Sequence, residues 1–186
     1  EALDAATQGF KDALTEKMPD VKFDEQNAAG DAATCVTITS KFAADGVDLI
    51  LANATSPLQA AVSATGDIPI LGTSITDYAT ALGMKEWNGT TGINVSGTSD
   101  LAPLDGQASM IQELFPEAKN IGLLYCSAEA NSVYQITTIK GYLEEMGYTC
   151  TEFAFAATCG IVYPRVVVVH EIVLACRDAE ACRFLG

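Results

Sequence analysis

Apolar positions along the chain switch between helical and strand spacing, and they predict helices and strands in alternation. Helices are predicted where apolar residues recur every three to four positions. Their approximate ranges are 3–14, 32–44, 58–64, 104–115 and 133–146. Strands are predicted where short runs are continuously apolar or alternate with acidic residues. Their approximate ranges are 21–25, 47–52, 68–72 and 120–125.

Residues that cap or stop helices support several of these boundaries. Pro19 follows the first helix and cannot continue it, and Gly147 is suited to end the last one. Asp31 is a favourable N-cap for the second helix. Ser56 is expected to cap the third helix, with Pro57 in its first turn, where no hydrogen-bond donor is lost.

Alternating helices and strands with short connections indicate a doubly wound α/β fold with parallel sheets and right-handed crossovers. The passage 87–100 is rich in glycine and hydroxyl residues and is interpreted as a crossover segment rather than packed structure. It divides the chain into a first α/β lobe, 1–98, and a partial second lobe, 99–186. Ligands of such sheets bind at the carboxyl ends of the strands, so candidate residues are sought in the loops there.

Composition and charge narrow the classes of function. The 186 residues have the size of about one ordinary domain, and with 49% hydrophobic residues they have ample material for a packed core. The formal net charge of -14 opposes binding to nucleic acid or to an anionic membrane surface. No run approaches the length of a membrane helix, and no export signal opens the sequence.

The cysteines and the single histidine do not suggest a metal or cofactor site. The six cysteines form no CxxC pair, and His170 lies in an apolar run, so structural zinc is not expected. Free buried thiols are favoured, with a disulfide among Cys159, Cys176 and Cys182 as the alternative in an exported protein. The sequence has no GxGxxG, GxxxxGK[ST] or GxSxG motif, and no cofactor is expected.

Small hydroxyl and acidic residues gather in the loops that follow the predicted strands. A helix N-terminus that carries Thr55 and Ser56 suits a carboxylate, because its backbone N–H groups are free and its dipole is positive. Acidic residues in equivalent loops suit an ammonium group. Together they predict a receptor for a zwitterion such as an amino acid. The acids in question are Asp77, Asp100 and Glu129, each of which a capping or solvent-exposed role would also explain.

A cysteine-dependent racemase or related isomerase is the alternative from a different class. Cys126 ends a predicted strand, and a pair of cysteines across two α/β lobes could abstract and return a proton. The matching loop of the first lobe offers Asn53 and Thr55 in place of a second cysteine.

Several blocks, in the same order, give residues 1 to about 156 a close resemblance to the ABC-transporter substrate-binding proteins of the tryptophan/tyrosine-type family. A series of blocks in order is more specific than any single one of them. The blocks are 2–6, 9–14, 26–31, 47–52, 67–71, 76–77, 97–100 and 127–132.

The resemblance implies a periplasmic-binding-protein type I fold, in which two hinged lobes close over a small ligand and deliver it to an ABC permease. It also implies an extracytoplasmic protein without catalytic activity. By position, the resemblance implies that the first-lobe residues that bind a carboxylate are Thr55, Ser56, Ser74 and Thr76. Second-lobe contacts fall on Glu129, Asn131 and Ser132, whereas Asp77 and Asp100 match ammonium or hinge groups, and Tyr78 or Tyr134 could stack on an aromatic ligand.

The chain departs from the family pattern at both ends. The family's first strand is missing before Glu1, and the tail from about residue 157 has no family match, as a frameshifted or rearranged gene end would explain. Residues 166–174 are strand-like and are expected to complete a sheet or to pair with another chain, and 177–185 to form a short helix. The expected consequence is an incomplete second lobe. A third interpretation is therefore that the chain is a truncated member of the family, which folds but has no transport function.

Overall fold

The computed structural model describes residues 2–156, 168–169 and 172–176 of the chain. After Leu101 the chain divides into two compact units. Each unit contains its own sheet and its own core. The α/β architecture predicted from the alternating pattern is confirmed.

The first unit contains a parallel three-stranded sheet in the order β1-β2-β3. Ile50 pairs with Ile70, which pairs in turn with Val95, so the three strands start level with one another. The strands are β1 (Ile50–Asn53), β2 (Ile70–Ile75) and β3 (Val95–Ser99). The helices are α1 (Ala2–Lys17), α2 (Ala32–Asp45), α3 (Thr55–Ala64) and the short α4 (Tyr78–Ala81).

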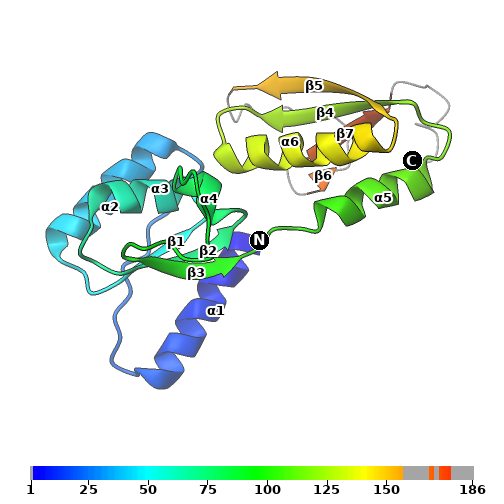
Figure 1. Cartoon of the computed structure of the whole chain (residues 1–186). Coiled ribbons are helices and arrows are strands. Elements are labelled where there is room, and N and C mark those ends of the chain that lie inside the picture. Colours follow the sequence, from blue (N-terminus) through cyan, green and yellow to red (C-terminus); the bar gives the residue numbers. More distant parts are fainter. Residues whose placement is uncertain (1, 157–167, 170–171, 177–186) are drawn as a thin grey trace. The chain divides into compact units, whose positions relative to one another are not determined.

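Helices cover both sides of this sheet. Figure 1 shows α2 and α3 side by side above the sheet and α1 below it. The core lies between the sheet and α2–α4, where Ile70, Ile75 and Leu58 are almost fully buried and Phe42 of α2 packs against them. Burial of these apolar side chains supplies the main stabilising free energy of the unit.

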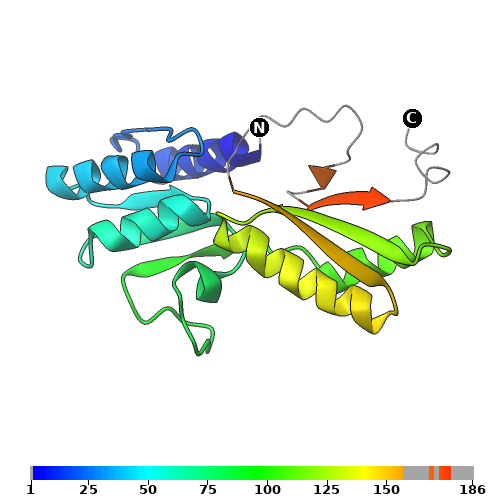
Figure 2. The same ribbon diagram turned by 90° about the horizontal axis from the view of Figure 1, so that it is seen from above.

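The second unit contains a four-stranded sheet in the order β5-β4-β7-β6. Its central strand β4 is parallel to β5 and antiparallel to β7. Figure 2 shows α6 running alongside β4 and β5. The strands are β4 (Asn120–Cys126), β5 (Thr149–Phe155), β6 (Val168–Val169) and β7 (Ile172–Cys176), and the helices are α5 (Leu104–Leu114) and α6 (Ala130–Glu145).

The core of the second unit forms where α5 and α6 pack together and against the sheet. Leu123 of β4 and Leu143 of α6 are completely buried, and Ile111 extends the cluster to α5. The apolar faces of α5 and α6 thus pack into one shared core.

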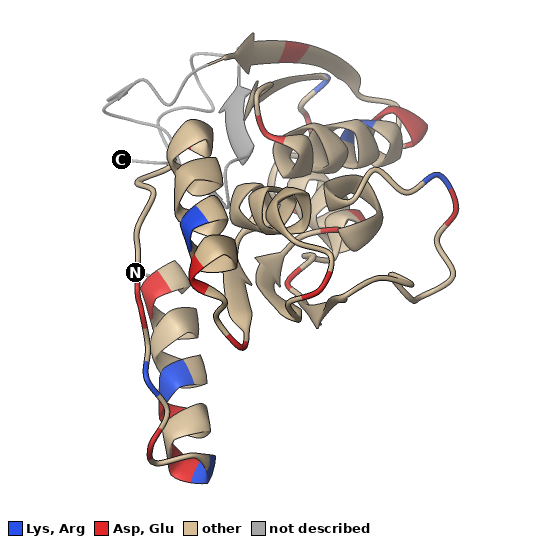
Figure 3. Cartoon of the chain, turned by 90° about the vertical axis from the view of Figure 1, so that its left-hand side faces the viewer, with Lys and Arg blue, Asp and Glu red and all other residues tan. Residues whose placement is uncertain are grey.

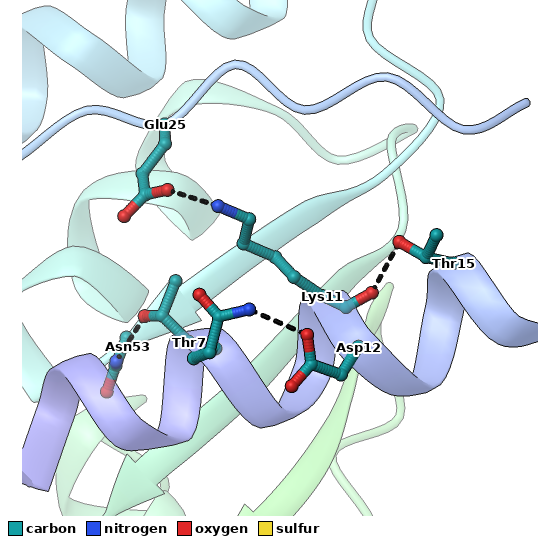
Figure 4. Close-up of polar contacts among 7 residues, drawn as sticks. Thr7, Lys11, Asp12, Thr15, Glu25 and Asn53 are labelled. Carbon is teal, nitrogen blue, oxygen red and sulfur yellow. Dashed lines mark hydrogen bonds and ion pairs between the residues drawn. The ribbon is translucent and has the colours of Figure 1, made fainter. Parts of the chain in front are cut away.

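The predicted strand at 21–25 is wrong. These residues form a connection without strand pairing, although apolar and acidic side chains alternate along it. Its acids bind lysines instead: Glu25 lies 2.8 Å from the Lys11 ammonium, and Asp24 lies 3.2 Å from that of Lys41 (Figure 4 shows the Lys11–Glu25 pair). A segment with alternating apolar and polar residues forms a strand only where a neighbouring strand provides partners for its backbone hydrogen bonds. The described residues offer none to this segment.

The interpretation of 87–100 as an unpacked crossover is wrong at its end. Val95–Ser99 is β3, which pairs in parallel with β2. Only Val95 and Thr98 favour a strand intrinsically, and the glycine between them disfavours one, so the sequence does not mark this strand. The neighbouring β2 supplies the hydrogen-bond partners that the local sequence cannot reveal.

In the described part of the strand-like tail, β6 pairs with β7 and β7 adds to β4, so the tail completes a sheet as one of the two expectations had it. The pairing of β7 with β4 is antiparallel, which differs from the all-parallel sheets predicted. The predicted helix at 177–185, Cys159 and Cys182 lie outside the described residues.

Acidic residues outnumber basic ones over the described elements, as the red and blue positions of Figure 3 show. Among the described residues, no helix is both long enough and apolar enough to span a membrane.

Candidate functional site

The three strands of the first sheet end at a common edge, and the predicted first-unit residues lie in the segments that leave it. The Ala54 N–H donates to the Thr73 carbonyl at 3.0 Å just beyond β1. The Asp100 N–H donates to the Ile75 carbonyl at 3.1 Å just beyond β3. These segments carry Thr55, Ser56, Thr76, Asp77 and Asp100, whereas Ser74 is the penultimate residue of β2 itself.

Helix α3 starts directly at this edge and has no side-chain cap. Its N-cap is Ala54, with φ of 96°, so the expectation that Ser56 caps the helix is wrong. Because β1 ends at Asn53, the chain turns within one residue and Ser56 already lies inside the first turn. Pro57 in that turn has no N–H, as predicted. The first-turn N–H groups and the positive end of the helix dipole favour an anion here.

Positive φ angles mark the sharp turns at this edge. Ala54 and Ser74 both adopt them, at 96° and 55°, although neither is glycine. Such conformations are costly for residues with a Cβ and persist only where the surrounding structure holds them. Both therefore fix the direction in which the chain leaves its strand.

The loop after β2 is held by hydrogen bonds from neighbouring segments. The Ser99 hydroxyl donates to the Thr76 carbonyl at 2.9 Å. The Asp77 carboxylate accepts the Thr80 N–H at 2.7 Å and thereby caps α4. This bond occupies one oxygen of the carboxylate, whereas Asp100 lies exposed at the end of β3.

Tyr78 is a core residue in this structure. Only 8% of its surface is exposed, and it belongs to the apolar cluster of the first unit. Burial raises the pKa of its hydroxyl, and the negative charge of Asp100 raises that pKa further. Tyr78 therefore has the core role that was the alternative to stacking on a ligand.

The second unit carries its own polar group where β4 leads into α6. Glu129 occupies the N-cap position of α6, and the Ser132 hydroxyl donates to its carboxylate at 3.2 Å. Ser132 is 3% exposed, and Asn131 lies beside it in the first turn. The three predicted second-lobe residues thus gather at one helix N-terminus.

The segments in which β1, β2 and β3 end contain no cysteine that could pair with Cys126 in the racemase alternative. Cys126 is the last residue of β4 and is 6% exposed. Of the other described cysteines, Cys35 lies in α2, and Cys150 and Cys176 lie in β5 and β7. No cluster of three or more potential metal ligands occurs in the part of the chain that the structure describes.

Asn53 and Ser99 were not predicted from the sequence to shape this edge. The Asn53 amide donates to the Leu3 carbonyl at 2.7 Å and to the Thr7 hydroxyl at 2.9 Å (Figure 4 shows the contact with Thr7). It ties α1 to the end of β1. Its buried Oδ1 accepts no hydrogen bond from the described residues. Its position directly after a predicted strand was the only available signal.

Comparison with known proteins relates this chain to a family. Residues 1–167 match the family described as ABC transporter substrate binding protein. A tyrosine-binding protein from Clostridioides difficile is 40% identical over 155 residues, which are 81% of this chain and 45% of that protein.

Solved structures agree with that assignment. An ABC domain from Streptococcus pneumoniae in complex with L-Trp has a TM-score of 0.77 at 37% identity, covering 84% of this chain and 54% of the other. A ligand-free, open substrate-binding protein with adhesive properties from Clostridium difficile has a TM-score of 0.61 at 39% identity, with the same two coverages. The chain spans about half the length of these relatives. On these grounds, the chain belongs to the ABC transporter substrate-binding protein family.

Proposed function

We propose that the chain is the solute-binding component of an ABC-type uptake system and that its ligand is a small zwitterion, an amino acid with an aromatic side chain. Family membership and the ligands named for two relatives, tyrosine and L-Trp, support the proposal. The observation that carries it is the uncapped N-terminus of α3 at the edge where β1, β2 and β3 end.

The ligand carboxylate would bind at that helix end. The first-turn N–H groups of α3 and the hydroxyls of Thr55, Ser56 and Ser74 are hydrogen-bond donors of the kind that a carboxylate needs. Thr76 adds a further hydroxyl from the loop after β2. No basic side chain is required, which accords with a chain that has only 10 Lys and Arg.

The ligand ammonium would bind an acid. Asp100 is exposed at the end of β3, and Glu129 lies at the N-terminus of α6 with Asn131 and Ser132. Asp77 is the weaker candidate in the first unit, because one of its oxygens already accepts the Thr80 N–H. An ammonium held by a carboxylate forms a charge-assisted hydrogen bond, which is roughly twice as strong as a neutral one.

The proposal includes the mode of action of this family's receptors: binding shifts the protein toward the arrangement that the ligand prefers, and only to the extent of that preference. Delivery to a permease and an extracytoplasmic location follow from the same proposal.

A thermal-shift screen of the purified chain against the amino acids tests this function. A ligand at 100 times its dissociation constant stabilises a fold by about 2.7 kcal/mol, so a genuine ligand gives a clear rise in Tm. We expect L-tyrosine or L-tryptophan to raise the Tm, and Ser74→Ala or Glu129→Ala to abolish the rise.

Ser63→Ala and Glu113→Ala are matched controls, because both residues are exposed and lie in helices away from these loops. They should leave the rise intact. A cooperative melt that no amino acid shifts would refute the proposed function.

A further inference from the structure

Strands β2 and β3 lose their register next to Ser74. Gly72 pairs with Gly97, but the next pair is Ile75 with Ser99, so β2 advances three residues while β3 advances two. The additional residue forms a β-bulge, a feature that redirects a side chain at the end of a strand. Ser74 lies within it, with φ of 55°.

The hydroxyl of Tyr78 lies where the pairing is interrupted. It is 3.0 Å from the Gly72 carbonyl oxygen on β2 and 3.3 Å from the Thr98 carbonyl oxygen on β3. A hydroxyl has one proton, so the two carbonyls share one donor. The Tyr78 side chain thereby links β2 and β3 in addition to the backbone hydrogen bonds between these strands.

Two glycines make room for this hydroxyl. A Cβ built on Gly72 or on Gly97 would collide with the Tyr78 oxygen. The one at Gly97 would also strike the Gly72 backbone, and Gly97 has a φ of 153°. Glycine is therefore required on both strands, and Tyr78, Gly72 and Gly97 form one fitted group, here called the tyrosine wedge.

We propose that Tyr78 is a positioning residue for ligand binding: the tyrosine wedge holds the β2 bulge and so directs Ser74 toward the ligand edge. The ligand part of this inference rests on the proposed function. A tyrosine hydroxyl is protonated at neutral pH and can donate, and burial and the nearby Asp100 raise the pKa of Tyr78 further. Thr98 and Gly72 supply only carbonyl acceptors to it.

The geometric part is tested without ligand by a double-mutant cycle. Gly72→Ala should lower the Tm strongly in the wild-type background, because the new methyl group meets the hydroxyl. In the Tyr78→Phe background the same substitution should lower it much less, or should restore folding if Gly72→Ala alone does not fold. Additive effects, or equal failure to fold in both backgrounds, would overturn the wedge.

The ligand part is tested by calorimetric titration of L-tyrosine into Tyr78→Phe. Ile50→Val is the control, because it trims the same core cluster on β1, away from the bulge. We expect Tyr78→Phe to weaken binding by about tenfold and the control to stay within about twofold of wild type. Wild-type affinity in Tyr78→Phe would overturn the positioning role. If the wild-type chain binds no L-tyrosine, the proposed function has failed, and the double-mutant cycle still decides whether the wedge exists.

Discussion

Asn53 fastens a helix to the end of a strand through one amide group. The Leu3 carbonyl can only accept a hydrogen bond, so the amide nitrogen must face it and Oδ1 must point away. The same nitrogen donates to Thr7. The side chain therefore cannot be replaced by an isosteric carboxylate, which has no proton to donate at neutral pH.

We predict that Asn53→Asp destabilises the first unit more than Asn53→Ala does. One carboxylate oxygen could accept from the Thr7 hydroxyl, but the carboxylate would still face the Leu3 carbonyl with no proton between them, and a partly buried group left unpaired in this way costs about 1–3 kcal/mol. For a domain of this size, each kcal/mol lowers the Tm by about 4–8 °C. Thermal melts at pH 7 measure the effect. Gln8→Ala, which removes an exposed bond to Asp12, serves as the control with almost no effect. Equal melting of Asn53→Asp and wild type would disprove the role of the amide.

At the scale of the elements, α2 depends on its N-cap. The Asp31 carboxylate accepts the Thr34 N–H at 2.6 Å, and hydrogen bonding from Thr34 holds the pKa of Asp31 below its ordinary value of 3.8. A lowered folded pKa adds stability above the ordinary value, and this stability is lost as the pH falls through the folded pKa.

Asp31→Ala should therefore melt a few degrees below wild type at pH 7, and the difference should shrink when the pH falls well below 3.8. Asp31→Asn is the control, because its side chain also caps but does not titrate. Melting curves of the three proteins over a pH series measure this. A difference between Asp31→Ala and wild type that stays constant into acid would contradict the account.

The pairing of β7 with β4 makes a prediction for individual amides. The Ser127 N–H, just after β4, donates to the Phe155 carbonyl of β5. Backbone groups alternate in direction along a strand, so the backbone N–H groups of odd-numbered β4 residues point toward β5 and those of even-numbered residues point toward β7. Truncation after Ala156 should speed hydrogen exchange at the Gly122 and Leu124 amides and leave that of Leu123 protected. Exchange measured by NMR distinguishes the two sets. Unchanged protection at Gly122 and Leu124 would show that β7 does not pair there.

The sequence predicted helices better than strands, for a physical reason. Helical hydrogen bonds are local, so apolar spacing and a cap such as Asp31 suffice to predict α2. A strand needs a neighbour, which local sequence does not show. For that reason 21–25 was wrongly predicted as a strand, and Val95–Ser99 was missed.

The site was predictable in its residue types and only partly in its geometry. Parallel strands bring their carboxyl ends together, so hydroxyls and acids after β1 and β2 could be expected at one edge. The one-residue turn at Ala54, which moved Ser56 from the cap into α3, leaves no mark in the sequence. The bulge at Ser74 depends on Tyr78 and on a glycine in β3, which is a tertiary relation.

At the scale of the whole molecule, each of the two units presents a polar group at a strand-to-helix junction. The N-terminus of α3 in the first unit offers donors that suit an anion, and Glu129 at the N-terminus of α6 in the second offers a carboxylate that suits a cation. The formal charge of -14 makes a purely anionic ligand unfavourable. We therefore propose that the protein recognises both charged ends of its ligand.

Calorimetric titration of the full chain with L-tyrosine and with tyramine tests that claim most directly. Tyramine keeps the ring and the ammonium but lacks the carboxylate, so it cannot use the α3 N-terminus. We predict saturable one-to-one binding of L-tyrosine and an affinity for tyramine lower by about 100-fold, which is about 2.7 kcal/mol. Equal affinities for the two compounds, or no heat with L-tyrosine under conditions where the chain is folded, would contradict the account.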